Sequence, residues 1–269
     1  MVQTNMEFVK NGYVFEDLLA IMAVLRGEGG CPWDIEQTHQ SIRKDLLEEA
    51  YETADAIDRN SVEDMKEELG DLLLQVVFHS QIGKENGEFT FDEVVDGICK
   101  KLVYRHPHIF SDVTVKNSEE VLNNWDKLKV KEKNMSDFTD TLKSVPTAFP
   151  ALMRAQKVQK RASKAGYDFE NVSDAFLKVE EELSELKAAK EKNDTVLATE
   201  ELGDLLFSVV NVARFIGADS EESLTKSVDK FIRRFEKAEE LAKDKNQSLD
   251  SLSAKELDVL WNKAKELLK

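Results

Sequence analysis

Apolar residues recur every three or four positions along most of the chain. The first such stripe contains Leu18, Met22 and Leu25, and it ends at a stretch rich in glycine. This spacing places the apolar side chains on one face of a helix. Ser61 precedes another stripe that continues through residues 69–77, so we expect a further helix to begin at this serine.

The same reading predicts helices throughout the chain. Ser253 and Glu256 have the spacing of a capping box, in which each side chain binds the backbone N–H of the other residue. Only four prolines and eleven glycines interrupt the chain, and no segment has the alternating pattern of a half-buried strand. We therefore expect an all-α protein. The expected helices include residues 18–25, 42–57, 69–77, 91–105, 118–133, 151–163, 173–190, 196–215, 220–243 and 254–268.

One acidic segment occurs twice. Residues 67–73 return unchanged as residues 200–206, which lie 133 positions later. At the same offset, the glutamates of residues 48–52 recur in residues 181–185. An internal repeat of this kind indicates two homologous halves. The expected organisation is an N-terminal helical domain over residues 1–133, a linker over residues 134–150 and a C-terminal helical domain over residues 151–269.

The net charge of −16 restricts the classes of partner. Binding to a nucleic acid polymer needs clustered basic residues, so we do not expect it here. A small polyanion complexed with a divalent cation remains compatible with an acidic protein. The two cysteines form no C-x-x-C pair, and no apolar run reaches the length of a membrane helix or a signal peptide. We expect a cytoplasmic protein without a membrane partner.

Carboxylates within each copy are spaced to share a helix face. Glu49 and Glu52 project together, as do Glu68 and Asp71 on the next predicted helix. Antiparallel packing of the two helices would bring both pairs into one small volume, where a divalent cation would offset their mutual repulsion. Without nearby Cys or His, such oxygen ligands favour Mg²⁺, with Mn²⁺ as a possible substitute. The candidate metal ligands are Glu49, Glu52, Glu68 and Asp71 in the first half and Glu182, Glu185, Glu201 and Asp204 in the second.

A simpler interpretation is an acidic helix face that only contacts solvent. For a single E-E-x-x-E segment we would prefer that interpretation, because surface helices commonly carry such runs. The in-register repeat and the leucines and valines that follow each copy favour a binding site instead.

The paired acidic motifs resemble those of the MazG family of nucleoside triphosphate pyrophosphohydrolases. Three further stretches carry the resemblance, namely Gly30 to Asp34 with Gln37 and Thr38, Arg105 to Phe110, and Ala151 to Lys157. The similarity covers nearly the whole chain and is specific to two-domain bacterial members of the family.

The resemblance implies an all-α fold in which helices from two copies of the chain assemble bundles, and therefore a homodimer. It implies hydrolysis of an NTP or dNTP to a nucleoside monophosphate and pyrophosphate, with Mg²⁺ as cofactor. Broad tolerance of the base follows if the base is held by stacking, because every base has a π face.

Residue matching transfers the family's roles to the second half. The general base stays open, with Glu181 as a candidate. The resemblance implies metal binding by Glu182, Glu185, Glu201 and Asp204, phosphate contacts by Lys178, Lys230 and Arg234, and stacking on the base by Trp261.

The two halves differ at the predicted phosphate contacts. Lys178 corresponds to Asp45 in the first half, although Lys44 is adjacent. Lys101 and Arg105 have the same spacing as the basic pair of the second half, and Trp125 is only a loose counterpart of its tryptophan. We therefore expect the second half to contain the principal catalytic site.

Two other functions remain open. One is a helical regulatory protein whose acidic helices bind cations or a partner, and the other is a dUTP or dCTP pyrophosphatase of narrow specificity. The two-half organisation argues against the latter. Glu36 and His39 have the spacing of a di-iron motif, but the motif occurs once and beside a loop, so we do not expect a di-iron site.

Overall fold

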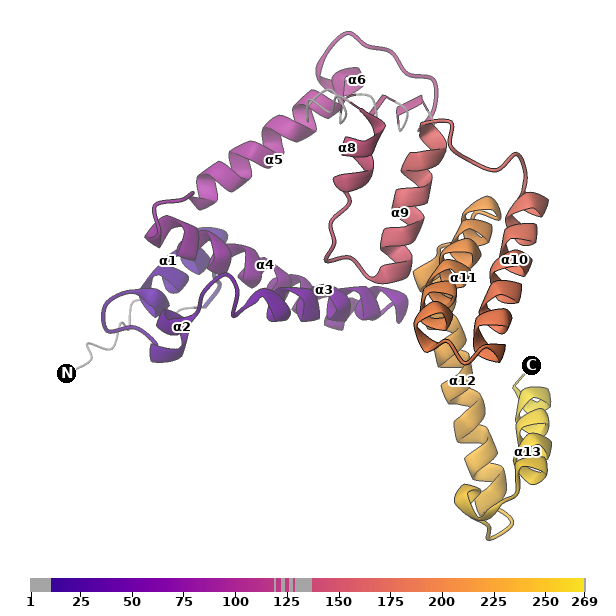
Figure 1. Cartoon of the computed structure of the whole chain (residues 1–269). Helices are drawn as coiled ribbons and strands as arrows, with labels where there is room; N and C mark the ends of the chain where they lie inside the picture. Colours follow the sequence, from indigo (N-terminus) through magenta and orange to yellow (C-terminus); the bar gives the residue numbers. More distant parts are fainter. Residues whose placement is uncertain (1–10, 119, 122–123, 126–127, 129–136, 269) are drawn as a thin grey trace. The chain divides into compact units, whose positions relative to one another are not determined.

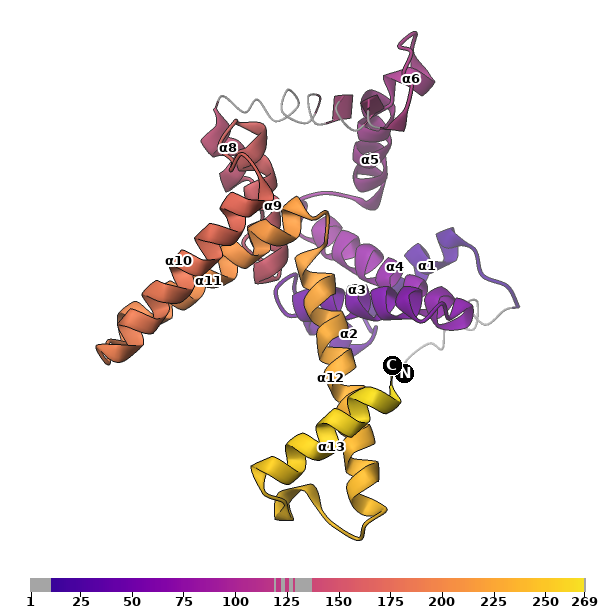
Figure 2. The same cartoon turned by 90° about the vertical axis from the view of Figure 1, so that its right-hand side faces the viewer.

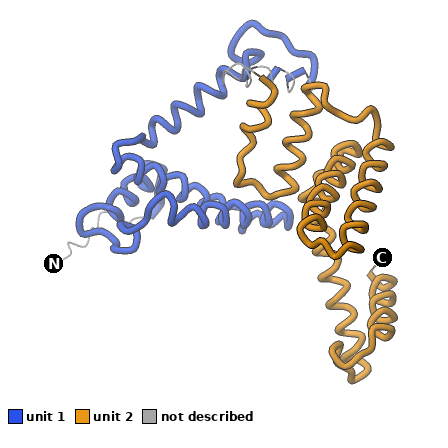
Figure 3. The backbone as a smooth tube through the Cα atoms, viewed as in Figure 1, with its two compact units in different colours: residues 1–128 blue, residues 129–269 orange. Residues whose placement is uncertain are grey.

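The computed structural model describes residues 11–118, 120–121, 124–125, 128 and 137–268. The chain divides into two compact units, residues 1–128 and residues 129–269 (Figure 3). The described residues form helices and no strand, which confirms the all-α prediction.

The first unit is built around a helical hairpin. Its helices are α1 (Phe15–Arg26), α2 (Pro32–Glu36), α3 (Arg43–Asp58), α4 (Val62–Glu85), α5 (Phe91–Arg105) and α6 (Pro107–Phe110). Helices α3 and α4 lie side by side, and α1 packs against α4 (Figures 1 and 2). Met22, Ile42, Val77, Phe78 and Ile82 form the buried core of this unit. The apolar stripes seen in the sequence therefore face each other here.

The second unit repeats this hairpin. Its helices are α8 (Phe138–Lys143), α9 (Ala151–Lys164), α10 (Val172–Glu191), α11 (Thr195–Phe215), α12 (Ser220–Lys243) and α13 (Ala254–Leu267), with a 3₁₀ turn, η2, at Leu249–Ser251. Helices α10 and α11 form the hairpin, α9 packs against α11, and α13 packs against α12 (Figures 1 and 2). Between α12 and α13, the buried side chains of Ala238, Ala242, Leu260 and Ala264 pack together.

The turn of each hairpin uses the same local device. Asn60 ends α3 with a φ of 53°, and Asn193 ends α10 with a φ of 54°. Asparagine tolerates this left-handed conformation better than most residues, and the conformation stops a helix in one step. In both turns the next residue donates its N–H back into the helix, from Ser61 to Ala56 O and from Asp194 to Ala189 O, each at 3.1 Å. The register between the paired helices is thus the same in both units.

Most predicted helix limits are confirmed. The Ser253 and Glu256 capping box is present, and α4 begins after Ser61, although the Ser61 side chain makes no capping bond to the backbone. The short helices α2, α6 and α8 were not predicted. The helix expected over residues 118–133 lies largely outside the described residues.

Part of the predicted linker is structured. Residues 134–136 lie outside the described residues, but α8 occupies the middle of the range and packs on α9. Val145 is buried, and Arg161 of α9 donates to Ser144 Oγ at 2.5 Å. This segment belongs to the second unit, and the exact domain limits stay a prediction. Of the helices that the structure describes, none combines the length and apolar character needed to cross a membrane.

We predict that Gly30→Ala destabilises the first unit. A Cβ atom at Gly30 would lie 2.3 Å from Leu25 O and 2.5 Å from Val24 O, and backbone atoms cannot move aside as a side-chain tip can. We expect a loss of about 1–3 kcal/mol in the free energy of unfolding, measured by urea denaturation with circular dichroism.

Gly97→Ala is the matched control, because a Cβ there meets nothing within 4 Å in α5. It should stabilise that helix by about 0.5–1 kcal/mol. Equal effects of the two substitutions would contradict the close approach at Gly30.

Candidate active site

Three carboxylates of the second unit converge across its hairpin. Glu182 comes from α10, and Glu201 and Asp204 come from α11. One oxygen atom from each side chain can be chosen so that all three lie within 4.8 Å of one another. Glu181, Glu182 and Glu185 make an overlapping group with the same spacing. The structure thus brings together all five acidic residues predicted for the second half.

We call Glu181, Glu182, Glu185, Glu201 and Asp204 the second acidic cluster. Burial and like charge both act on these carboxylates. Glu182 is only 5% exposed. The pKa of Glu201 is raised, first by desolvation and then by the charges of Glu185, Glu182 and Asp204. A group of carboxylates in this state attracts a cation.

One cation of the protein already binds the cluster. Lys178 Nζ lies 2.6 Å from Glu182 Oε1 and 2.9 Å from Glu181 Oε1. These hydrogen bonds raise the pKa of Lys178, so the ammonium group is firmly protonated. One ammonium charge cannot balance five carboxylates, so the cluster keeps an excess of negative charge that a divalent ion could neutralise.

A cavity of about 650 Å³ adjoins the cluster. Residues of α8, α9, α10 and α11 and of the loop after α9 all contribute to its wall. It is lined by Lys178, Glu182 and Asp204 together with Leu142, Val158, Gln159, Ala162, Gly166, Tyr167, Asp168, Phe169, Phe207, Ser208, Asn211 and Arg214. The acidic cluster therefore borders a space of the size that small-molecule ligands occupy.

The first unit contains a matching acidic cluster. Oxygen atoms of Glu49, Glu52 and Glu68 lie within 4.8 Å of one another. Desolvation, followed by the charge of Asp71, raises the pKa of Glu49, so Asp71 belongs to the same group. The pKa of Glu68 is raised as well, by desolvation and then by the charges of Glu52 and Asp71.

The ion pair that Lys178 makes with the second cluster is not repeated by Lys44 in the first. Lys44 is 81% exposed, and its Nζ lies 3.5 Å from Asp45 Oδ1, which is outside the cluster. The predicted difference between the halves at this position is therefore present in the structure.

Three predicted substrate contacts lie elsewhere in the second unit. Lys230 and Arg234 are on α12, and Trp261 is on α13, where its ring lies 5.1 Å from the ring of Phe231. None of the three lines the cavity beside the acidic cluster. Within one copy of the chain, the structure does not bring them together with the carboxylates.

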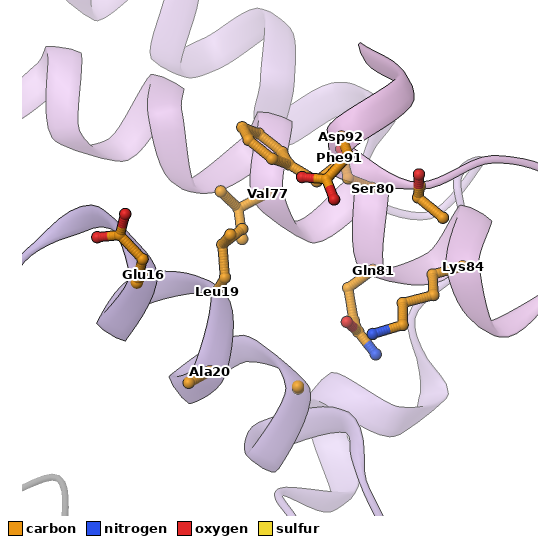
Figure 4. A pocket seen from close by; sticks show the side chains of 11 residues that line it. Glu16, Leu19, Ala20, Val77, Ser80, Gln81, Lys84, Phe91 and Asp92 are labelled. Atoms are coloured by element: carbon orange, nitrogen blue, oxygen red, sulfur yellow. The ribbon is translucent and has the colours of Figure 1, made fainter. Parts of the chain in front are cut away.

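The first unit has a different cavity, of about 480 Å³, between α1, α4 and the start of α5 (Figure 4). Leu19 and Val77 lie close together in its middle, and Lys84 and Gln81 lie at one side. It contains no predicted site residue. Of the three acidic groups found among the described residues, none includes a histidine, and His39 instead stacks on His79 at 5.1 Å.

Several cavity residues were not predicted from the sequence. Asn211 and Arg214 follow Asp204 at helical spacing on α11, so the periodicity that identified the carboxylates also contained them. Gln159 and Asp168 have no such signal, because only the packing of α9 and its following loop brings them to the cavity.

Comparison with known proteins identifies relatives over more than nine-tenths of the chain. The sequence profile of the MazG nucleotide pyrophosphohydrolase domain matches twice, at residues 37–110 and 170–243. A nucleoside triphosphate pyrophosphohydrolase/pyrophosphatase MazG of Thermotoga maritima is 42% identical over 254 residues, which cover 94% of this chain and 96% of that protein.

Two other relatives are similar at the same level. A nucleoside triphosphate pyrophosphohydrolase of Escherichia coli K12 is 41% identical over 251 residues, covering 92% of this chain and 95% of that protein. The uncharacterized protein YabN of Bacillus subtilis is 48% identical over 257 residues, which cover 94% of this chain but only 52% of that protein.

We predict that Glu201→Gln raises the melting temperature of the metal-free protein at pH 7. A raised pKa means that the folded state binds a proton more tightly than the unfolded chain, so the associated stability is lost as the pH rises through the folded-state pKa. Removing this charge should relieve the repulsion at pH 7 and change little below about pH 4. Calorimetry in EDTA across this pH range measures both effects.

Glu200→Gln is the control, because Glu200 is the exposed neighbour and lies outside both groups that converge in the second unit. It should raise the melting temperature much less than Glu201→Gln does, because the charge of Glu200 is the last of the causes that raise the pKa of Glu201. If both substitutions raised it equally, net charge and not the cluster would be the cause.

Proposed function

The chain belongs to the MazG nucleotide pyrophosphohydrolase family, and from this premise we propose that it hydrolyses nucleoside triphosphates to a nucleoside monophosphate and pyrophosphate. The observation that carries the proposal is the convergence of Glu182, Glu201 and Asp204 beside Lys178 at the edge of a cavity. Carboxylates for a metal and an ammonium group for phosphate are the two components that this reaction needs.

Mg²⁺ is the proposed cofactor, with Mn²⁺ as a substitute. The donor set fits either ion, because it consists of carboxylate oxygens that are partly desolvated and carry excess negative charge. When bound, the metal would neutralise the triphosphate and lower the pKa of the attacking water. Glu182, Glu185, Glu201 and Asp204 are the proposed ligands in the second half, and Glu49, Glu52, Glu68 and Asp71 in the first.

The protein's own groups complete the reaction. The oxygen of the water bonds to the α-phosphorus, the bond from this phosphorus to the bridging oxygen breaks, and pyrophosphate leaves. Glu181 is our candidate for accepting the water's proton, since it is exposed and already positioned by Lys178. The ammonium group of Lys178 would then leave the carboxylates and bind a phosphate oxygen.

The second half is the proposed principal site. Its cluster includes Lys178, whereas the first half has Asp45 at this position. An additional carboxylate in place of an ammonium group weakens binding of a triphosphate. The first half would act as a weaker copy.

We also propose a homodimer. Along α12, Leu224, Val228, Phe231 and Phe235 form an apolar stripe at helical spacing, and each side chain is about half exposed. On α11, Val210 is buried, but Leu206 and Val209 are exposed. A second copy would cover these faces and complete the bundle.

The repeated glycine supports the same assembly. Gly70 and Gly203 lie inside helices, where glycine is unfavourable. Apart from the adjoining backbone of its own helix, no described part of the chain comes within 4 Å of a Cβ built at either position. Close approach by a second chain would account for both. Lys230, Arg234 and Trp261 would then contact the substrate bound by the other copy, with Trp261 stacking on bases of any identity.

Phosphorus NMR of the products tests the reaction. With Mg²⁺ and each NTP or dNTP, we expect nucleoside monophosphate and pyrophosphate. Glu201→Gln should lower kcat by about 100-fold or more, because it removes a metal ligand. The matched substitution Glu68→Gln in the first half should leave most of the activity.

The products also separate the alternatives. Nucleoside diphosphate and phosphate would contradict the proposal, and cleavage of dUTP or dCTP alone would indicate a narrow specificity. Cation binding without any hydrolysis would favour a regulatory protein.

We predict that Val228→Glu combined with Ile98→Glu converts the dimer to a monomer. Val228 is half exposed in the α12 stripe, and Ile98 is about half exposed on α5, where Val94, Ile98 and Leu102 form a similar apolar stripe in the first unit. Charges at these positions could not be buried against a second copy. Light scattering after gel filtration measures the mass, and activity should fall with it. Val62→Glu with Val196→Glu is the control, because these valines are more exposed and lie in the first turns of α4 and α11. A monomeric wild-type protein would refute the proposed assembly.

A further inference from the structure

The wall of the cavity beside the second acidic cluster combines two kinds of side chain. Lys178, Glu182 and Asp204 are the charged groups, where phosphate and metal would bind. The rest of the wall consists of apolar side chains such as Val158 and Phe207, together with a few polar groups. The predicted site residues account for the charged groups only.

Gln159 is one of three polar residues of the cavity wall that are buried, together with Glu182 and Ser208. It is 6% exposed, and its Nε2 donates to Phe207 O at 2.7 Å. Its Oε1 has no hydrogen-bond partner within the part of the chain that the structure describes. A buried carbonyl oxygen without a donor costs free energy, so a partner from outside the chain is expected.

The orientation of this amide is determined by its contact. Phe207 O is a backbone carbonyl and can only accept, so the NH₂ group of Gln159 must face it. The oxygen is therefore the atom without a partner among the described residues. Gln159 thus places an unpaired acceptor in the cavity wall.

The polar groups farther along α11 are fixed as well. Arg214 Nε and Nη2 donate to Asn211 Oδ1 at 3.0 and 2.7 Å. Arg214 also pairs with Asp168 from the loop after α9. This network holds the loop against α11 and gives the cavity a defined wall, so the free acceptor sits in a preformed site.

We propose that this cavity holds the nucleoside of the substrate and that Gln159 Oε1 accepts a hydrogen bond from an N–H group on the edge of the base. The inference rests on the proposed pyrophosphohydrolase function and assigns a further residue to it. Adenine and cytosine offer an amino group, and guanine, uracil and thymine offer a ring N–H. One acceptor thus serves every common base, and a base without an N–H on that edge is disfavoured.

The test compares ATP with purine riboside triphosphate, which lacks the amino group of adenine. For the wild-type chain with Mg²⁺, we expect kcat/KM to be about 10-fold or more higher for ATP, because the analogue leaves the buried acceptor unpaired. Gln159→Met should reduce this ratio to near one. Gln159→Glu should retain a preference, since its protonated carboxyl can donate to Phe207 O and still accept from the base.

Gln156→Met is the matched control. Gln156 lies one turn earlier on α9, both ends of its amide are bonded, to Ala218 O and to Ser220, and it does not line the cavity. Its substitution should lower stability and leave the ratio of the two substrates unchanged. A purely structural role for Gln159 would give the same result as this control.

The outcomes separate the two proposals. If wild-type protein releases pyrophosphate from neither nucleotide, the pyrophosphohydrolase function has failed. If it cleaves both with equal kcat/KM, or if Gln159→Met keeps the preference for ATP, the function stands and the role of Gln159 is overturned.

Discussion

The close approach of carboxylates across the α10–α11 hairpin is the constraint on which the second unit depends. Helices α10 and α11 pack along their length, with Ala175 and Ala189 buried on α10 and Val210 buried on α11, and the turn at Asn193 sets which faces meet. A shift of one residue would rotate a helix face by about 100° and separate the acids. The helix packing therefore maintains an electrostatic repulsion that Lys178 partly offsets, as expected where a cation binds.

Comparison of the two repeated units separates the features that build the hairpin from those that set the charge beside it. Both units have the asparagine turn, the convergent carboxylates and the glycine inside the helix. They differ in the charge next to the cluster, where Lys178 binds Glu182 and Lys44 binds only Asp45. The same hairpin thus supports two electrostatic environments, and the predicted difference in activity follows from a single position.

The sequence was sufficient for features that depend on neighbours along the chain. Helical periodicity, the Ser253 cap and the spacing of the carboxylates are local, so the helices and the acidic clusters were predicted. The short helices α2, α6 and α8 were missed because each has too few residues to show a helical period. Helix α2 begins at Pro32, α6 begins at Pro107, and α8 follows the Asp137 cap. Gln159 was missed because its role depends on the packing of α9 against α11. Lys230 and Trp261 lie away from the cavity, and no pattern within one chain specifies contacts between two copies.

The two proposed contacts with the base act on different surfaces. Trp261 of a second copy would cover the ring face, and Gln159 would bind the edge from within the cavity. Neither distinguishes strongly among the common bases, because all have a π face and an N–H group. Together they would fix the nucleoside at one end while metal and Lys178 fix the phosphates at the other. The α-phosphorus then lies between two anchors, so the binding energy of the base orients the reacting atom although it selects little among substrates.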